Sequence, residues 1–242
     1  MATDITRQFE VSSAKSGPRT PAGPRATDWD AYYARPYRTA SLTRAITGAR
    51  LVAAIRRHVV PEPVVVELGG ANSCFFDLIR EQIRPREYHI VDTNRLGLER
   101  FRERQGDLKH VQLHHADVLS LNLPVQADLV FSVGLIEHFD LPGTREAVRA
   151  HFRLLKPRGI ALITFPTPTW LYRLTRSLSE ASRAWIFHDE RPLAFDEVDR
   201  AAAGCGTVLE KRIVWPIFLT QYHVVWKNGR RAGKGGNDGM VE

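Results

Sequence analysis

The sequence predicts an α/β protein with a doubly wound, mostly parallel sheet of seven strands and an antiparallel hairpin at one edge. Short apolar runs alternate with segments of helical length from residue 41 to residue 203. This order is typical of parallel strands that are joined by helical crossovers. The last two strand-like runs, 207–215 and 220–227, are separated by a short link only, which permits an antiparallel pair.

The first predicted strand is the apolar run "VVVEL" at residues 64–68, bounded by Pro63 and a glycine pair. A continuous apolar run of this length is typical of a parallel strand that is buried on both faces. The further strands are expected at 87–92, 110–116, 127–133 and 160–165. The helices are expected at 41–58, 74–83, 95–105, 144–155 and 195–203.

The same patterns divide the chain. Residues 1–27 are rich in Ser, Pro, Gly, Thr and Ala without periodicity, and predict a disordered leader. Residues 28–228 form the predicted domain, and 229–242 a flexible Gly-rich tail. Within the domain the alternation of strands and helices stops at 166–192, which indicates a lid-like insert.

The composition is that of a soluble globular protein, with 43% hydrophobic and 25% charged residues among 242. The first residues show no apolar run of a signal peptide, so we expect a cytoplasmic protein. The two cysteines, Cys74 and Cys205, match no metal-site spacing and are expected to be buried thiols of a reducing compartment rather than a disulfide. The net charge of +7 comes largely from scattered arginines, which are typical of a solvated surface, so nucleic acid is an unfavoured partner.

A ligand site is predicted where the first strand ends, in "VVELGGANS". Gly69 and Gly70 follow the strand directly, and glycines there commonly let a ligand or a helix approach the backbone. Glu67 is an acid within the buried strand, and a buried carboxylate is costly unless it is paired. The turn therefore suggests a nucleotide-like ligand with a positive or hydroxyl-rich part.

Two further acids follow the next strands. Asp92 closes the second strand, where a carboxylate can accept both hydroxyls of a ribose, although it could equally cap the helix from residue 95. Asp117 follows the third strand. A dinucleotide-binding loop is disfavoured, because Gly-x-Gly-x-x-Gly is replaced here by Gly69-x-Ala71-x-x-Cys74.

The stretches "VVELGGANS", "HIVDTN", "HHADVLSL" and "DLVFSVGLIEHF", with the later "LLKPRGIALITFPTP", resemble the class I S-adenosylmethionine-dependent methyltransferases. The likeness covers about residues 41–227 and implies a Rossmann-like fold with S-adenosyl-L-methionine as cofactor. It places the first loop at the methionine half, Asp92 at the ribose, Asp117 and the following backbone at the adenine, and the exit of the fourth strand near the methyl group. The cofactor-binding residues implied in this way are Glu67, Gly69, Gly70, Ala71, Asp92, Asp117, Val118 and Val133.

The exit from the fourth strand carries Glu137 and His138, a pair similar to that of coenzyme Q O-methyltransferases. Those enzymes carry an additional metal-binding Glu where this sequence has Gly134, so no metal site is predicted. Methyl transfer requires an aligned acceptor and a base to remove its proton. The candidate bases are His138 and His188, and a structural role for the Glu137–His138 pair has equal weight.

The insert places an apolar stripe on one helical face, and this stripe predicts lid core, an acceptor pocket or a contact with a membrane interface through 168–187. Tyr32, Tyr33 and Tyr37 could close over the cofactor or simply pack. The stripe consists of Trp170, Leu174, Leu178, Ala181 and Trp185.

Taken together, the resemblance implies methyl transfer to a small-molecule or lipid-like acceptor at an oxygen, nitrogen or carbon atom. Two alternatives stay open at this point. The net charge allows an RNA methyltransferase, although no Asn/Asp-Pro-Pro-aromatic loop follows the fourth strand. The altered glycine loop allows a non-catalytic interaction module with the same fold.

Overall fold

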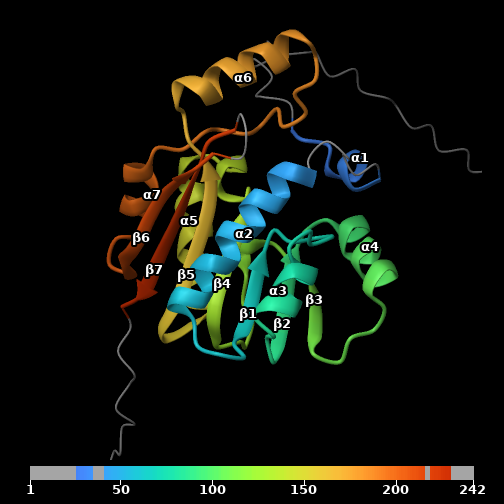
Figure 1. Cartoon of the computed structure of the whole chain (residues 1–242), viewed down its shortest axis with the longest axis vertical. Coiled ribbons are helices and arrows are strands. Elements are labelled where there is room, and N and C mark those ends of the chain that lie inside the picture. Colours follow the sequence, from blue (N-terminus) through green and yellow to red (C-terminus); the bar gives the residue numbers. More distant parts are fainter. Residues whose placement is uncertain (1–25, 35–40, 216–218, 230–242) are drawn as a thin grey trace, which may run out of the picture.

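A computed structural model describes residues 26–34, 41–215 and 219–229. Its centre is one seven-stranded sheet in the order β3-β2-β1-β4-β5-β7-β6 (Figure 1). The first five strands are parallel, and β7 is antiparallel to both β5 and β6. This confirms the predicted doubly wound sheet, with β7 inserted between β5 and the edge strand β6. The strands are β1 (Val64–Leu68), β2 (Glu87–Asp92), β3 (Val111–His115), β4 (Ala127–Val133), β5 (Leu155–Pro166), β6 (Gly206–Val214) and β7 (Gln221–Asn228).

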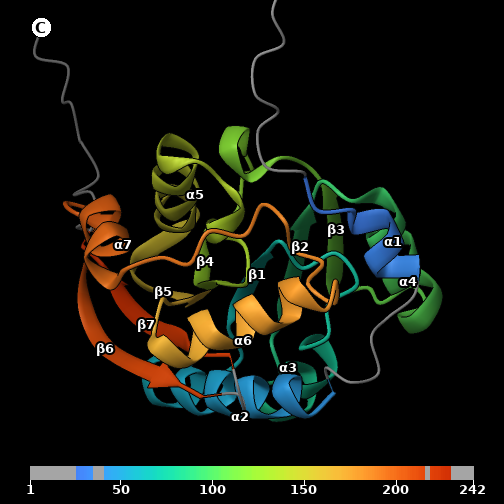
Figure 2. The ribbon, with the colours of Figure 1, turned by 90° about the horizontal axis from the view of Figure 1, so that it is seen from above.

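Helices cover both faces of the sheet, as Figure 2 shows from above. Helices α2, α3 and α4 lie on one face, α5 and α7 lie on the other, and α6 crosses over the carboxyl ends of the parallel strands. Helix α1 packs beside α4. The helices are α1 (Trp29–Ala34), α2 (Ser41–His58), α3 (Phe76–Gln82), α4 (Arg95–Gln105), α5 (Leu141–Arg153), α6 (Trp170–Ala181) and α7 (Phe195–Ala202), with single 3₁₀ turns at Val118–Ser120 and Ile136–His138.

Each face of the sheet has its own apolar core. On the side of α3 and α4, Phe76 meets Tyr88 and Phe101 edge to face at ring distances of 5.1 and 5.0 Å. On the side of α5 and α7, Phe152 and Trp226 are among the buried residues that pack together. With both faces covered, the inner parallel strands β1, β4 and β5 are largely buried, which explains their continuous apolar runs, whereas the edge strand β3 is partly exposed.

Three elements begin two or more residues away from the start that the sequence predicts. Helix α3 begins two residues late, where the Ser73 hydroxyl accepts from the Phe76 N–H at 3.0 Å. Helix α5 begins earlier, at Leu141, because the Asp140 carboxylate caps it by accepting from the Gly143 N–H at 2.8 Å. Strand β5 also begins earlier, so the predicted turn before it belongs to the strand.

The insert contains a helix, but its apolar stripe is not lid core. Helix α6 ends at Ala181, so Trp185 lies beyond it. The side chains of Trp170, Leu174 and Leu178 are 71%, 50% and 63% exposed, whereas Trp185 is buried. The prediction that Trp185 shares one helical face with the others is therefore wrong, and the exposed residues do not fit the lid-core alternative. None of the described helices is long and apolar enough to cross a membrane.

The ends of the predicted domain are partly described. Thr27, the last residue of the predicted leader, is buried, and its backbone N–H donates to Asp189 Oδ2 at 3.2 Å. Gly229 begins the predicted tail, and its N–H donates to the Cys205 carbonyl at 2.8 Å. Tyr37 and the rest of the leader and tail lie outside the described residues. Both cysteines are free thiols, but the expectation that they are buried is wrong, because Cys74 is exposed and Cys205 is partly buried.

Candidate functional site

A cavity of about 560 Å³ opens at the carboxyl ends of the parallel strands, beneath α6. Ligands of open α/β sheets bind at this edge, where the strand order reverses between β1 and β4. The cavity has two ends of different composition. We call the part lined by Glu67, Asp92 and Asp117 the cofactor end, and the part lined by Glu137, His138, Asp189 and Glu190 the acceptor end.

The loop after β1 needs its glycines for two different reasons. Gly69 has a φ of 71°, and a Cβ built there would lie 2.8 Å from Leu135. A Cβ at Gly70 would lie 2.8 Å from the Glu67 side chain. Ala71 adopts a positive φ of 28°, so the loop keeps a glycine-like backbone even where the sequence has alanine. The loop can therefore approach a ligand closely at the cofactor end.

Glu67 is fully enclosed beneath this loop. Its Oε2 accepts from the Tyr88 hydroxyl at 2.7 Å, so the carboxyl has a partner within the fold. Burial raises the pKa of Glu67 to about 7, although hydrogen bonds from Ser73 and Tyr88 oppose the shift.

Asp92 and Asp117 both line the cavity, at the ends of β2 and β3. The Asp92 carboxylate accepts from the Asn94 N–H at 2.7 Å, and burial raises its pKa. Asn94, not Asp92, is the side chain that caps α4, because its Oδ1 accepts from the Gly97 N–H at 2.7 Å. Asp117 Oδ1 accepts from the Leu119 N–H at 2.9 Å. Both acids are therefore within reach of a ligand in the cavity.

The structure brings the predicted cofactor residues together. All of them except Ala71, which is buried behind the loop, line the cavity. Their assignment to parts of the cofactor stays a prediction.

The amino-terminal segment forms one wall of the cavity. Trp29, Tyr32 and Tyr33 of α1 line it, and Trp29 lies 5.0 Å from His138 and 5.9 Å from Phe187 between ring centroids. Arg44 of α2 also lines the cavity and donates to the Tyr32 hydroxyl at 2.7 Å. Tyr32 and Tyr33 therefore line the site, in an aromatic wall that also includes Trp29, which was not predicted.

At the acceptor end, His138 forms a pair with Asp189. Its Nδ1 lies 2.9 Å from Asp189 Oδ1, and Thr27 donates its hydroxyl to the same carboxylate. Although burial opposes it, hydrogen bonds from Thr27 and His138 lower the pKa of Asp189. Burial lowers the pKa of His138. An ionised Asp189 must accept the proton on Nδ1, which leaves Nε2 unprotonated and able to take a proton.

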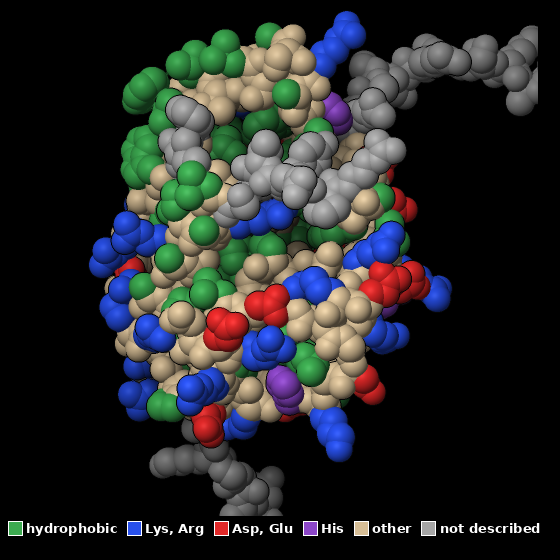
Figure 3. Space-filling model, turned by 45° about the vertical axis from the view of Figure 1, so that its right-hand side comes forward, with side chains coloured by type: hydrophobic (Ala, Val, Ile, Leu, Met, Phe, Trp, Pro, Cys, Tyr) green, Lys and Arg blue, Asp and Glu red, His purple; other side chains and the backbone are tan. Residues whose placement is uncertain are grey.

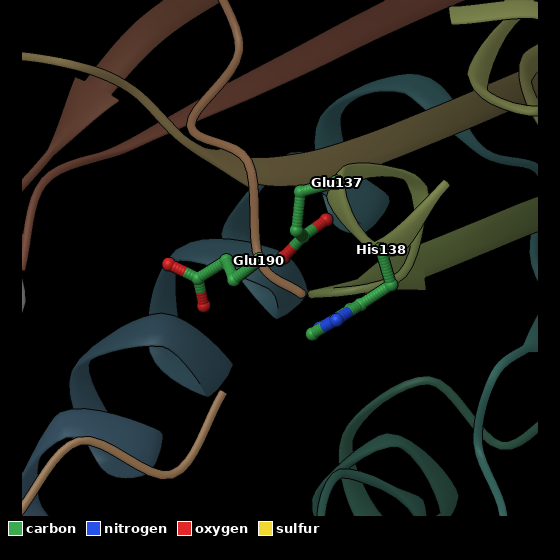
Figure 4. A group of neighbouring side chains, drawn as sticks. All are labelled: Glu137, His138 and Glu190. Atoms are coloured by element: carbon green, nitrogen blue, oxygen red, sulfur yellow. The ribbon is translucent and has the colours of Figure 1, made fainter. Parts of the chain in front are cut away.

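Two more carboxylates stand beside this pair. Glu137 comes from the 3₁₀ turn after β4, and Glu190 comes from the segment that precedes α7 (Figure 4). The Tyr172 hydroxyl of α6 donates to Glu190. One ligand atom each of Glu137, His138 and Glu190 lies within 4.8 Å of the others, so the group is compact enough to surround a cation.

Burial raises the pKa values of both carboxyls. Burial raises the pKa of Glu137 well above its ordinary value, and the neighbouring Glu190 and Asp189 raise it further. Burial also raises the pKa of Glu190 to about 7, against the lowering effects of Tyr172 and Arg176.

His188, the second predicted base, is exposed and is not among the residues that line the cavity. Its neighbours Phe187, Asp189 and Glu190 take the inward positions. Asp189 and Glu190 were not predicted as site residues, because they belong to an irregular segment without periodicity. The signal that could have found them is the acidic pair beside the predicted base in "FHDERPL".

A family model described as a methyltransferase domain matches residues 66–161. None of the curated proteins matches the chain significantly. The N-methyltransferase NodS from Bradyrhizobium japonicum WM9, bound to S-adenosyl-L-homocysteine, superposes with a TM-score of 0.65 at 14% identity, over 83% of this chain and 96% of that chain.

Two further solved structures show the same fold. The magnesium protoporphyrin IX methyltransferase from Synechocystis PCC 6803, with bound S-adenosyl-L-homocysteine, gives a TM-score of 0.63 at 10% identity, over 83% of this chain and 92% of that chain. The 1,6-didemethyltoxoflavin-N1-methyltransferase from Burkholderia thailandensis, with bound 1,6-didemethyltoxoflavin and S-adenosylhomocysteine, gives 0.62 at 16% identity, over 84% and 86%.

The matched segment runs from β1 into β5 and contains the glycine loop, Asp92, Asp117 and the turn with Glu137 and His138. The sheet order and the antiparallel β7 are shared with structures that hold the product of S-adenosylmethionine. The cavity presents its glycine loop and acids at the edge of the sheet where such a ligand binds. Residues 66–161 therefore match a methyltransferase domain, and the fold around them is that of solved methyltransferases that hold S-adenosyl-L-homocysteine.

Proposed function

We propose that the protein transfers the methyl group of S-adenosyl-L-methionine to a small or lipophilic metabolite held at the acceptor end of the cavity. The observation that carries the proposal is the His138–Asp189 pair, which lies in the same cavity as the glycine loop and Asp92. A base and a cofactor site that share one enclosed space are what an acceptor with an acidic proton requires.

The residues supply alignment and a base. When bound, S-adenosyl-L-methionine supplies an electrophilic methyl group on a positively charged sulfur. Asp92 is positioned to hold the ribose hydroxyls, and Asp117 with the Val118 backbone to hold the adenine. Asp189 orients the imidazole of His138, whose Nε2 accepts a proton from the acceptor. Helix α6 and the aromatic wall exclude water from above.

The acceptor end disfavours the RNA alternative. Glu137, Asp189 and Glu190 present carboxyl groups there, whereas an RNA site would need cationic side chains facing the phosphates. The solved neighbours named above include enzymes of porphyrin and toxoflavin methylation, and these small acceptors support the same class for this chain.

The outward face of α6 supports a lipophilic acceptor that is collected at a membrane surface. Trp170, Leu174 and Leu178 are exposed, and hydrophobic side chains gather over the top of the molecule, where α6 lies (Figure 3). The same helix exposes Arg173, and the whole chain carries a net charge of +7. An apolar helix face on a basic protein is suited to the interface of an anionic membrane.

The decisive experiment combines calorimetry with methyl transfer. We expect the full chain to bind S-adenosyl-L-methionine and S-adenosyl-L-homocysteine and to transfer labelled methyl groups to a component of a small-molecule or lipid extract. Transfer to total RNA, or no binding of either compound, would contradict the proposal. His138→Gln should abolish transfer while leaving the binding of S-adenosyl-L-homocysteine within about threefold, because His138 lies at the acceptor end.

A further inference from the structure

Glu137 is a buried acid without a full set of partners. Its side chain lines the cavity, the residue is 1% exposed, and its Oε2 is fully buried with no hydrogen-bond partner among the described residues. Leaving a buried carboxylate oxygen unpaired is costly, so such an atom is expected to meet a ligand that donates to it.

The charges around Glu137 select the kind of ligand. Two other acids, Glu190 and Asp189, act on it electrostatically, and His138 lies in the same compact group. Among the described residues that line the cavity, Arg44 is the one Lys or Arg side chain, and it is directed to the Tyr32 hydroxyl. An anionic acceptor would therefore meet repulsion at this end, whereas a cation would neutralise it.

The walls around the acids are aromatic. Phe187 packs against Trp29 in a tilted arrangement and against His138 edge to face, at ring distances of 5.9 and 6.0 Å. Trp185 meets Phe187 edge to face at 6.1 Å. Aromatic faces attract an organic cation and also pack against its apolar body. A site with carboxyl groups surrounded by aromatic side chains is suited to bind an ammonium group that is attached to a hydrophobic framework.

We infer that the methyl acceptor is an amine, which enters as an ammonium ion and donates hydrogen bonds to Glu137 and Glu190. This inference deepens the proposed function and rests on it. It selects nitrogen from the acceptor atoms that the sequence leaves open.

The reaction balances with the groups in place. The ammonium loses one proton to His138 Nε2, and the freed nitrogen lone pair forms the N–C bond to the methyl group. The S–C bond breaks, its electron pair remains on sulfur, and S-adenosyl-L-homocysteine is released as a neutral thioether. The positive charge thereby moves from sulfur to nitrogen, next to Glu137, so the carboxylate stabilises charge as it develops.

A divalent metal ion is the competing cation, because Glu137, His138 and Glu190 could also surround one. The aromatic walls favour the amine. Aromatic side chains do not coordinate a metal ion, but they can pack against an organic cation. An ammonium ion and a metal ion would both bind Glu137 in its ionised form. The experiment must therefore distinguish the two cations by the probe that is used.

The test uses the full chain saturated with S-adenosyl-L-homocysteine and three probes of one shape. These are 2-phenylethylamine, 2-phenylethanol and phenylacetate, which present a positive, a neutral and a negative group on the same ring. Calorimetry in the presence of a chelator should show the amine binding about tenfold or more tightly than the alcohol, and phenylacetate binding weakest. In Glu137→Gln the preference for the amine over the alcohol should fall below about threefold.

Controls keep the outcomes distinct. Glu146→Gln, which removes a surface acid of α5, should retain the full preference. The amine assignment is overturned by equal binding of the three probes, by binding of none at millimolar concentration, or by an unchanged preference in a folded Glu137→Gln protein. It is also overturned if Mn²⁺ or Zn²⁺ binds the wild type but not Glu137→Gln and abolishes amine binding. Failure of the wild type to bind S-adenosyl-L-homocysteine would instead defeat the proposed function, and this inference with it.

Discussion

The two ends of the cavity are built in different ways. The cofactor end comes from the tips of β1, β2, β3 and β4, which are neighbours in the sheet and lie within one stretch of the chain. The acceptor end is assembled from pieces far apart in sequence. Asp189 receives hydrogen bonds from Thr27, 162 residues away, and from His138, 51 residues away. Adjacent strands fix the first end, and loops that meet only in the folded protein fix the second.

This difference explains why one fold can keep its cofactor and change its acceptor. Parallel strands place their carboxyl ends at one edge whatever their detailed sequence, so a few acids and glycines suffice there. The acceptor end depends on an insert, a turn and the amino-terminal segment, which can vary without disturbing the sheet. Variants at the two ends should therefore separate cofactor binding from acceptor binding.

The largest expected effect is at the cofactor end. Asp92→Ala should raise the dissociation constant of S-adenosyl-L-methionine by about a hundredfold or more, because two charge-assisted hydrogen bonds of about 1.5–3 kcal/mol each are lost. The measurement is calorimetry, with thermal melting as a check because Asp92 also accepts from the Asn94 N–H. Asp107→Ala, an exposed acid, is the matched control. Unchanged affinity in a folded Asp92→Ala protein would show that the ribose lies elsewhere.

The next effect is a pH dependence at the acceptor end. The pKa of Glu190 is about 7 because of its burial, so the carboxyl is largely neutral at pH 6 and ionised at pH 8. Asp189 raises this pKa, whereas Tyr172 and Arg176 lower it. The affinity for 2-phenylethylamine should therefore increase from pH 6 to pH 8. Glu190→Gln should flatten this rise and lower the affinity at pH 8 by about tenfold. An identical pH profile in wild type and variant would remove Glu190 from the acceptor site.

Substitution of the two tryptophans of the insert should have smaller effects on binding, and these effects should differ in kind between the two residues. Trp185 is buried, lines the cavity, and its Nε1 donates to the Phe187 carbonyl at 2.8 Å. Truncation to Ala should weaken acceptor binding more than cofactor binding, with a loss of stability of up to about 3–5 kcal/mol from the lost packing. Trp170 is exposed, so Trp170→Ala should leave the binding of soluble ligands unchanged and reduce binding to anionic vesicles. If Trp185→Ala melts early yet binds both ligands as before, Trp185 serves packing alone.

The smallest expected effect is that of a chelator. An ammonium ion in place of a metal at Glu137 and Glu190 predicts that dialysis against EDTA changes activity by less than about twofold. Activity that is lost on dialysis and restored by Mg²⁺ or Zn²⁺ would assign the acidic group of the acceptor end to a metal. This outcome would leave the cofactor end unaffected.

The cofactor end could be predicted from the sequence to a larger extent than the acceptor end. The strand ends with Glu67, Asp92 and Asp117 follow from continuous apolar runs, which indicate where parallel strands stop. The acceptor end has no such pattern. Of the two predicted bases, His138 lines the cavity and His188 does not, whereas Asp189 and Glu190 take inward positions. What covers the apolar stripe of the insert could not be predicted from the sequence, for a physical reason. Periodicity shows that a helix has an apolar face, but it does not show whether protein, solvent or a membrane covers that face.

The contact between Thr27 and Asp189 has a practical meaning for anyone who handles this protein. Thr27 holds the carboxylate that orients His138, although it lies almost at the start of the chain. A fusion partner, a tag or a protease cut that displaces Thr27 would release this tether and loosen the imidazole, while the sheet and the glycine loop stay in place. Such a preparation would look intact by folding and cofactor-binding criteria and still turn over slowly. The position at which an expressed protein begins is thus expected to affect its turnover rate.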